Sequence, residues 1–594
     1  MRLFIGVFLL CAVIYGLHLF DGYLADDYFY IGRLKQSFVT LIRVVSIDSF
    51  YPQMLRPVPA LFWALSALPW GDVLLHALSL LLHAVNASLI GLIVFHRTKS
   101  WGTAAAVAAA FASFPLFGEA VIWISGSYDL WSAAFALSAI YILIRKDADA
   151  RSIAAAGGLY ALALLCKESI IVLPFLLPLV FPWRKIRRAL LLFGAMAGVY
   201  LAVRLALFHG IGGYRTEEGS LIVLTSSPLG MLRVLLLQIP YRILLPLKYA
   251  GHLKPWILGA SAFLFLGLAW TTGILRKFTG LFKCLLGFCI AILPVATMIR
   301  IEYDHLGGRL LYFPVAVLLL LIGLHIGEIS NAAKGLFAAL ILLWTAVAIP
   351  NGSSWTDASK ERAAVLHAMK QAAPAVPEGS TVFVDVHETL RGAYVFNAGL
   401  NEAAKISGIR KNIVWIPGTA SMLDSAAAKG LGVNVFEMGF TPEGNAVDWS
   451  PCAKAIRSAP AAEILKWERP AFLTGSRIQS AGGGMTQIVS PMEPLNLSSG
   501  SCQIQMTFSG ISRPAKKNRL FWRTDPAIPF IATDFREFVI DGSPTAEVAL
   551  RLPRLEKTAS YLQWRVDFNK PLPPESLEAV LLGPLPPECL NGNP

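Results

Sequence analysis

Charged residues are scarce in this chain. They make up 15% of its 594 residues, whereas hydrophobic residues make up 55% and the mean hydropathy is +0.58. A water-soluble globular domain usually has about 25% charged residues. The shortage of charge excludes a soluble enzyme of this length and indicates a protein with many membrane segments.

Cysteine is also rare, which excludes a disulfide scaffold. Three of the seven cysteines, Cys452, Cys502 and Cys589, lie in the carboxyl-terminal part, where they allow at most one disulfide. None of the seven has the spacing of a zinc site. The sequence has no internal repeat and no low-complexity tract. It also lacks a basic stripe interleaved with aromatic residues, so we expect no nucleic-acid partner in spite of the pI near 9.4.

The chain does contain apolar segments of about membrane length. The first, 3–20, lacks a small-residue cleavage site and is expected to be a membrane helix rather than a signal peptide. The others are 72–95, 102–118, 128–145, 153–166, 169–183, 188–207, 229–247, 256–275, 281–298, 310–327 and 333–350. They predict a polytopic α-helical membrane domain over 1–351 with about 11–12 membrane segments.

The basic residues of the membrane part predict its orientation. Residues 1–351 contain 27 Lys and Arg against 15 Asp and Glu, and much of this excess lies in short loops such as 184–188 and 276–283. Such loops face the cytoplasm. The three apolar segments between these two loops must then cross an even number of times, and we expect 229–247, which is interrupted by charged residues and prolines, not to cross fully. We therefore expect eleven crossings of a bacterial inner membrane. They would place the amino terminus in the cytoplasm and residues 352–594 on the extracytoplasmic side.

The composition changes after residue 351. Strand patterns at 381–385 and 412–417 predict a small α/β domain over 352–490. Short strands separated by turn residues predict a β-sandwich-like domain over 495–594.

An acidic pair follows the first apolar segment, because Asp26 and Asp27 come a few residues after Phe20. Acids so close to hydrocarbon are costly, and they therefore suggest a functional site. The alternative is a solvated interfacial loop. Residues 21–71 around the pair mix aromatic and charged side chains, as interfacial helices do.

Three cations lie at the same predicted membrane face as the acidic pair. Arg56 precedes a proline in the first outer loop, Lys167 interrupts an apolar stretch, and Arg309 begins a span after two glycines. Arg and Lys in such places can bind an anionic phosphate. The alternatives are a mutual or interhelical ion pair for Lys167 and Glu168 and an interfacial anchor for Arg309.

Other polar residues recur against the apolar background. His76, Ser79, His83 and Asn86 fall on one face of a helix, where hydrogen bonds between helices are the alternative to a functional role. Glu119 lies in the turn between two spans, and Tyr312 follows Arg309.

In their order and placement these pieces resemble the GT-C superfamily of polytopic glycosyltransferases, which use polyprenyl-phosphate sugars. The likeness is strongest to the protein O-mannosyltransferases with tetratricopeptide repeats and their bacterial relatives. It rests on Asp26-Asp27, Leu55-Arg56-Pro57, His76-x6-His83-x2-Asn86, Pro115-x3-Glu119-Ala-Val-x-Trp123-Ile-Ser, Leu165-Cys-Lys167-Glu168-Ser169 and Gly308-Arg309-Leu-Leu-Tyr312-Phe-Pro314. It covers 1–351 only. The chain departs from it at Ser79 and Ser127, and no tetratricopeptide repeat follows.

The resemblance implies an inverting transferase that moves a sugar from a polyprenyl-phosphate donor to a glycan, lipid or protein hydroxyl at the extracytoplasmic face. It implies either Asp26 or Asp27 as the base. Arg56, Lys167 and Arg309 are candidates for the donor phosphate, and supporting roles are expected for the set of Glu119, His83, Glu168 and Tyr312. No cofactor is certain, and a divalent metal is left open by the resemblance. The alternative function is a transporter or flippase for a lipid-linked saccharide, against which the absence of repeated spans argues.

Overall fold

The computed structural model describes most of the first 417 residues and twelve short segments after them. The described ranges are 1–46, 54–145, 149–208, 228–248, 253–296, 301, 304–396, 398–417, 435–440, 446–448, 465–468, 477–481, 485–489, 493–494, 502–509, 515–523, 535–540, 545–552, 561–568 and 577–584. Cys452 and Cys589 lie outside these ranges, and the prediction of at most one disulfide among Cys452, Cys502 and Cys589 therefore falls largely outside the described residues. The chain forms two compact units, Met1–Tyr23 with Tyr30–Thr356 and Leu24–Phe29 with Asp357–Pro594.

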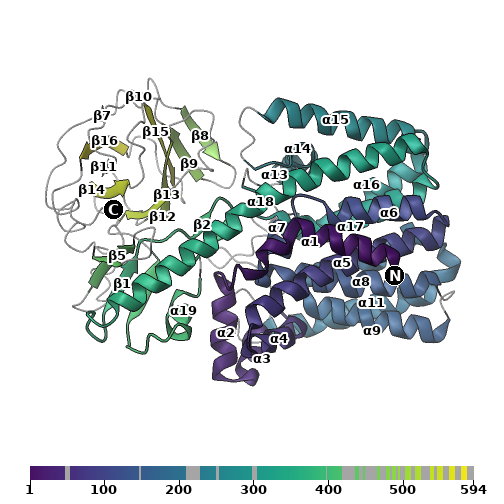
Figure 1. The fold of residues 1–594 in the computed structure, drawn as a ribbon, viewed down its shortest axis with the longest axis horizontal. Helices are drawn as coiled ribbons and strands as arrows, with labels where there is room; N and C mark the ends of the chain where they lie inside the picture. The colour runs from purple at the N-terminus through teal and green to yellow at the C-terminus, as the bar shows by residue number, and fades with distance from the viewer. Residues whose placement is uncertain are drawn as a thin grey trace. The chain divides into compact units, whose positions relative to one another are not determined.

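The first unit is helical (Figure 1). Helix α2 begins in the second unit and continues into the first, whereas α18 begins in the first and continues into the second. The helices are α1 (Arg2–Tyr15), α2 (Asp26–Gln36), α3 (Phe38–Ser46), α4 (Pro57–Trp63), α5 (Gly71–Thr98), α6 (Trp101–Ala112), α7 (Gly118–Val121), α8 (Tyr128–Arg145), α9 (Ala150–Cys166), α10 (Leu173–Val180), α11 (Trp183–Phe208), α13 (Pro228–Arg233), α14 (Ile239–Leu244), α15 (Lys254–Thr271), α16 (Phe278–Ile292), α17 (Tyr312–Ile326) and α18 (Asn331–Ala372). The 3-10 turns η4 (Glu168–Val172) and η9 (Gly308–Leu311) precede α10 and α17.

The predicted apolar segments are helical in the structure, each over most of its length. Among the described residues, seven helical segments are long and apolar enough to cross a membrane, namely Arg2–Phe20, Gly71–Thr98, Ile124–Arg145, Trp183–Phe208, Phe278–Val295, Gly308–Ile326 and Asn331–Ala372. Shorter apolar helices such as Ala150–Cys166 lie between them. The chain is therefore a polytopic helical membrane protein. The segment expected to be interrupted, 229–247, contains a π-helical turn (Val234–Gln238) between α13 and α14.

Helix α5 lies at the centre of the first unit and packs against α1, α6, α8 and α17. Its contact face is built from small residues, and Ala84, Ala87 and Gly91 are buried. A β-carbon added at Gly91 would lie 3.0 Å from the carbonyl oxygen of Ala104 in α6. Small residues let helix backbones approach closely, and in a membrane such packing replaces the hydrophobic drive for association.

Several loops that contain basic residues lie side by side at one end of this bundle. The ammonium of Lys277 donates to the carbonyl of His325 at 3.0 Å, and Thr103 Oγ1 donates to the carbonyl of Gly327 at 2.6 Å. The loops after α5, α15 and α17 are thereby neighbours. The other end of the bundle holds α7, η9 and the starts of α8 and α17, which are the elements that carry the candidate site.

In the second unit, a four-stranded sheet has the order β4-β1-β5-β6, from β1 (Thr381–Val384), β4 (Val414–Pro417), β5 (Val435–Phe440) and β6 (Ala446–Asp448). Strand β1 is parallel to both of its neighbours and is buried along its whole length. An apolar strand without alternation, such as Thr-Val-Phe-Val, is typical of this setting. The hairpin of β2 (Thr389–Leu390) and β3 (Ala393–Tyr394) and helix α19 (Leu400–Ile406) follow β1.

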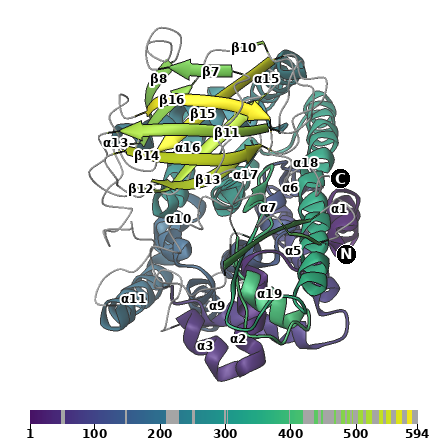
Figure 2. The same cartoon turned by 90° about the vertical axis from the view of Figure 1, so that its left-hand side faces the viewer.

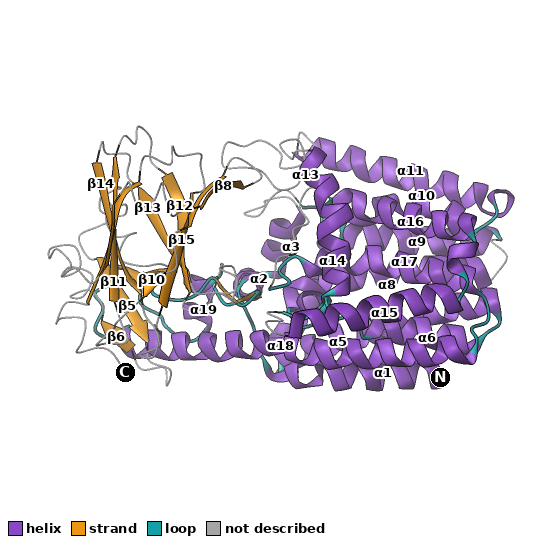
Figure 3. Cartoon of the chain, turned by 90° about the horizontal axis from the view of Figure 1, so that it is seen from above, coloured by secondary structure: helices purple, strands orange, loops and turns teal. Residues whose placement is uncertain are grey.

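The remaining strands form two sheets, which Figures 2 and 3 show as two layers. One has the order β13-β12-β15-β9-β8 with β10 on β15, and the other has the order β14-β11-β16-β7. Their strands are β7 (Leu465–Glu468), β8 (Arg477–Ala481), β9 (Met485–Val489), β10 (Glu493–Pro494), β11 (Cys502–Ser509), β12 (Ala515–Arg523), β13 (Phe535–Ile540), β14 (Thr545–Leu552), β15 (Tyr561–Phe568) and β16 (Leu577–Pro584). Both sheets combine strands from before and after residue 490. The division into domains over 352–490 and 495–594 stays a prediction.

Candidate active site

Ends of several helices in the first unit carry a cluster of ionic side chains. Arg56 immediately precedes α4, Lys167 lies between α9 and η4, and Arg309 belongs to η9. The acids are Glu119 in α7, Asp129 in the first turn of α8 and Glu168 at the start of η4. We call these six residues together with Arg204 of α11 the ion cluster.

Arg56 and Glu168 form a bidentate pair. The Nε of Arg56 donates to Oε2 at 2.9 Å, and its Nη2 donates to Oε1 at 2.5 Å. Arg204 approaches the same carboxylate at 4.0 Å and donates to the hydroxyl of Tyr200 at 3.1 Å. The Glu168 side chain is 31% exposed, whereas that of Arg204 is 4% exposed. Glu168 therefore lies at the open side of the cluster and orients two guanidinium groups.

Lys167 pairs with Asp129, since its ammonium donates to Oδ2 at 2.5 Å and both side chains are buried. Burial lowers the pKa of Lys167, and Asp129 opposes this shift. The positive charges of Arg56 and Arg309 lower the same pKa further. The three cations predicted from the sequence thus lie within electrostatic reach of one another.

Arg309 is held by Glu119 and Trp123. Its backbone N–H donates to Glu119 Oε2 at 3.2 Å, its Nε lies 3.5 Å from Oε1, and its guanidinium stacks over the Trp123 ring at 4.8 Å. Burial raises the pKa of Glu119, and Arg309 only partly offsets that effect. The Arg309 side chain keeps 21% of its surface exposed, so the guanidinium is oriented and still accessible.

Across the cluster, the described residues supply four cations and three carboxylates. A surplus of positive charge that is held in place by buried acids is suited to an anion, because the donors need little rearrangement when the anion arrives. Guanidinium and ammonium groups such as these are the groups that bind phosphate in proteins. Of the two structural alternatives for Lys167 and Glu168, the structure has the interhelical one, since Lys167 pairs with Asp129 and Glu168 pairs with Arg56.

The polar face of α5 mainly links helices. His83 Nδ1 lies 2.8 Å from the hydroxyl of Tyr312, and its Nε2 lies 3.1 Å from the carbonyl oxygen of Ala112. Asn86 donates to the same hydroxyl and to the carbonyl of Leu130. His83 is fully buried. His83 and Tyr312, both predicted as supporting residues, thus contact each other and join α5 to α17 and α6.

Asp26 and Asp27 open helix α2 and belong to the second unit. Asp27 is 1% exposed, and its Oδ2 accepts the backbone N–H of Leu24 at 2.9 Å. Asp26 is partly exposed. The residue before them, Ala25, has a φ of 48°, which an L side chain adopts rarely. The pair therefore lies in a strained turn, where the carboxylate of Asp27 accepts a backbone hydrogen bond and the side chain of Asp26 is partly exposed.

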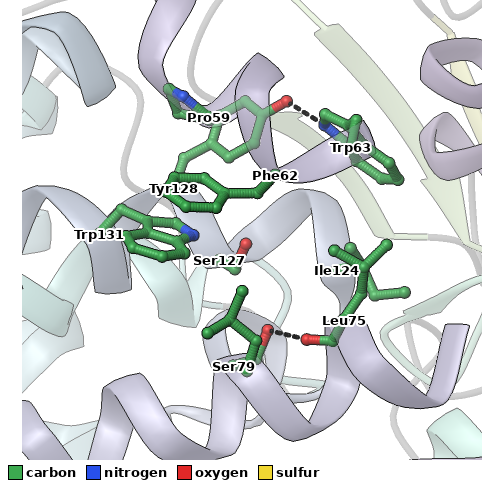
Figure 4. A pocket seen from close by; sticks show the side chains of 10 residues that line it. Pro59, Phe62, Trp63, Leu75, Ser79, Ile124, Ser127, Tyr128 and Trp131 are labelled. Atoms are coloured by element: carbon green, nitrogen blue, oxygen red, sulfur yellow. Dashed lines mark hydrogen bonds between the residues drawn. The ribbon is translucent and has the colours of Figure 1, made fainter. Parts of the chain in front are cut away.

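An aromatic pocket lies between α4, α5 and α8 of the first unit (Figure 4). The indole N–H of Trp63 donates to the hydroxyl of Tyr128 at 2.9 Å, and the rings of Phe62 and Trp131 stack with centroids 3.5 Å apart. Tyr128 is the neighbour of Asp129 in α8. The pocket is therefore next to one acid of the ion cluster.

Sequence reasoning did not select Arg204 or Asp129. Arg204 lies within an apolar helix near its end, where an isolated Arg is typical of an interfacial anchor. Asp129 lies four residues after Ser125, where the quoted motif ends, and its signal was an acid at the start of a span. Within the described ranges, no group of three or more His, Cys, Asp and Glu side chains is arranged to hold a metal ion.

No family model and no curated protein matches the chain. Among solved structures, ArnT from Cupriavidus metallidurans in its apo state is 13% identical, with 81% of this chain and 96% of that chain covered and a TM-score of 0.38. The same protein bound to undecaprenyl phosphate gives 13% identity, the same coverage and a TM-score of 0.37. The archaeal oligosaccharyltransferase AglB from Archaeoglobus fulgidus, in complex with an inhibitory peptide and a dolichol-phosphate, is 11% identical, with 98% and 96% covered and a TM-score of 0.41. At these identities and TM-scores the matches carry neither a residue role nor a function to this chain.

Proposed function

We propose that this chain is a membrane glycosyltransferase that moves a sugar from a polyprenyl-phosphate donor to an acceptor hydroxyl at the extracytoplasmic face. The ion cluster binds the phosphate of the donor. Asp26 or Asp27 acts as the base, and the partial exposure of Asp26 favours Asp26.

The proposed reaction is a single displacement. The acceptor oxygen attacks the anomeric carbon and forms the new glycosidic bond, while the bond from that carbon to the phosphate oxygen breaks. The aspartate takes the acceptor proton, and the polyprenyl phosphate leaves with the bonding electrons. Because the attack comes from the side opposite the leaving group, the configuration inverts. The phosphate gains negative charge in this step, so cations fixed around it lower the barrier as well as bind the donor.

The observation that carries the proposal is the arrangement of Arg56, Lys167 and Arg309. Each is oriented by a carboxylate, through Glu168, Asp129 and Glu119 respectively. Burying this many ionic groups is costly, and side chains that served helix packing alone could be apolar. Binding of an anion such as a phosphate would explain why these charged side chains are buried here.

The test combines a binding measurement on purified full-length protein with a comparison of two bacterial strains. The first is binding of undecaprenyl phosphate, for which Arg56→Gln and Arg309→Gln are expected to weaken affinity about 10-fold or more each. The second is a comparison of surface glycans by mass spectrometry between the wild-type strain and a deletion strain, in which one defined sugar should be lost. Lipid binding without any loss of a sugar would contradict the transferase. A transporter or flippase of a lipid-linked saccharide would instead show lipid binding but no transfer from a synthetic donor by the purified protein.

A further inference from the structure

The turn that carries Asp26 and Asp27 folds with the carboxyl-terminal part of the chain. Residues 24–29 form one compact unit with 357–594, although they follow the first membrane segment. The backbone N–H of Ala25 donates to the carbonyl of Val395 at 3.1 Å. The ring of Tyr28 stacks on Phe396, with centroids 5.9 Å apart. We call residues 24–29 the acidic corner.

Gly399 lies so close to the acidic corner that a residue with a side chain would not fit in its place. Its φ is +81°, and a β-carbon there would lie 2.6 Å from the carbonyl oxygen of Ala25 and 3.1 Å from Cβ of Tyr28. A glycine permits both this backbone conformation and this contact. The residue therefore fixes the distance between the corner and the start of α19.

Arg362 holds the corner from a second side. Its Nη1 donates to the hydroxyl of Tyr28 at 3.2 Å, while its Nη2 donates to Ser359 Oγ at 3.0 Å and its Nε to the carbonyl of Ser359 at 3.3 Å. The guanidinium is thus anchored on α18 and reaches the corner with its remaining nitrogen. A strained turn such as the one at Ala25 persists only where its surroundings determine its conformation.

We propose that Arg362, together with Val395, Phe396 and Gly399, positions the catalytic carboxylate by setting the conformation of the acidic corner. This inference rests on the proposed function, since it takes Asp26 or Asp27 as the base. The carboxyl-terminal part is then a component of the catalytic machinery rather than an independent appended domain. Small displacements of a catalytic group are expensive, because a shift of about 1 Å can cost about 100-fold in rate.

The experiment compares two matched pairs of full-length variants. Gly399→Ala is paired with Gly408→Ala, since Gly408 also has a positive φ of +94° but has no atom within 4 Å of an added β-carbon. Arg362→Met is paired with Lys360→Met, because Lys360 lies on the same helix and is highly exposed. Arg362→Lys keeps a donor and tests rescue, and Tyr28→Phe removes the same hydrogen bond from the other side.

Three readouts are measured on each variant, namely turnover with a synthetic polyprenyl-phosphate sugar, the pH profile of kcat/KM, and hydrogen exchange of residues 24–29. Gly399→Ala and Arg362→Met should lower kcat about 10- to 100-fold, shift the acidic limb of the profile and accelerate exchange in the corner. Affinity for undecaprenyl phosphate, measured in addition, should not change, which shows that the helical unit is folded. Hydrogen exchange in β1 should stay at the wild-type rate, which shows that the second unit is folded as well. Both control variants should behave like wild type.

Two results would overturn the inference. One is faster exchange with an unchanged kcat and pH profile, since the contacts would then be structural only. The other is an equal loss in Gly399→Ala and Gly408→Ala, since backbone strain and not the contact would then be the cause. If Gly399→Ala does not accumulate, Tyr28→Phe and Arg362→Met decide the question. Failure of the proposed function has a different signature, in which Asp26→Asn and Asp27→Asn both keep wild-type turnover.

Discussion

Replacement of Lys167 separates donor binding from helix packing. Lys167 and Asp129 form a buried ion pair, so Lys167→Met leaves the Asp129 carboxylate without its ammonium partner. Breaking one side of a buried pair usually costs about 3–5 kcal/mol of stability. A loss of activity in this single variant could therefore reflect the loss of folded protein.

The double variant Lys167→Met with Asp129→Asn removes both charges. Replacing both partners of a buried pair is often close to neutral for stability, so most of the 3–5 kcal/mol should be recovered. Donor affinity should not recover, because the charge-assisted hydrogen bond from the ammonium to the phosphate is still missing. Such a bond contributes about 1.5–3 kcal/mol, which corresponds to about a 10- to 150-fold increase in Kd.

The assay combines thermal unfolding in detergent with titration of undecaprenyl phosphate for wild type, both single variants and the double variant. Asp129→Asn alone keeps the cation but removes the carboxylate that orients it, so its affinity measures how much donor binding depends on that orientation. A stable double variant that binds the lipid with wild-type Kd would refute the phosphate role. Lys167 would then be a structural ion-pair residue.

Three further predictions use other parts of the chain. Asp26→Asn should lower transfer from a synthetic donor about 10²–10⁴-fold while donor binding is kept, because Asn cannot take the acceptor proton; near-wild-type turnover in both Asp26→Asn and Asp27→Asn would end the assignment. A periplasm-active reporter fused after Pro594 should be active, since the predicted eleven crossings would place residue 594 outside the cytoplasm, and activity of a cytoplasmic reporter there would contradict the orientation. Glu119→Gln should raise the melting temperature more at pH 8 than at pH 5. The raised pKa of Glu119 favours the folded state below its ordinary value of 4.5, and this contribution disappears as the pH rises through the raised pKa, so an equal effect at both values would argue against it.

The membrane helices could be predicted because their signal is local. A run of apolar residues is sufficient for a span, and each predicted segment is helical. The cations of the site were also visible locally, since Lys167 and Arg309 interrupt or border apolar runs. Arg204 was not, because one Arg near the end of a long apolar helix has the same local pattern as an interfacial anchor.

The partners of those cations depend on tertiary packing. Glu168 directly follows Lys167 in the sequence, yet it pairs with Arg56, and Lys167 reaches Asp129 on another helix. The chain is extended at Lys167, with a φ of −159° and a ψ of 128°. Successive side chains of an extended backbone point to opposite sides. A sequence pattern shows which charges are available but not which of two adjacent charges faces which neighbour.

The acidic corner shows the same limit at longer range, and it changes how the carboxyl-terminal part is understood. Nothing in the sequence near Ala25 indicates that its N–H donates to the carbonyl of Val395, and a lone glycine at position 399 does not reveal the close approach to Ala25 that it permits. If the corner carries the base, the two parts of the proposed reaction depend on different regions of the chain. Phosphate binding depends on the helical unit, whereas proton transfer depends on the fold of residues beyond 356. Changes in the carboxyl-terminal part should therefore alter the catalytic step before they alter donor affinity, which is the opposite of what an appended carbohydrate-binding domain would do.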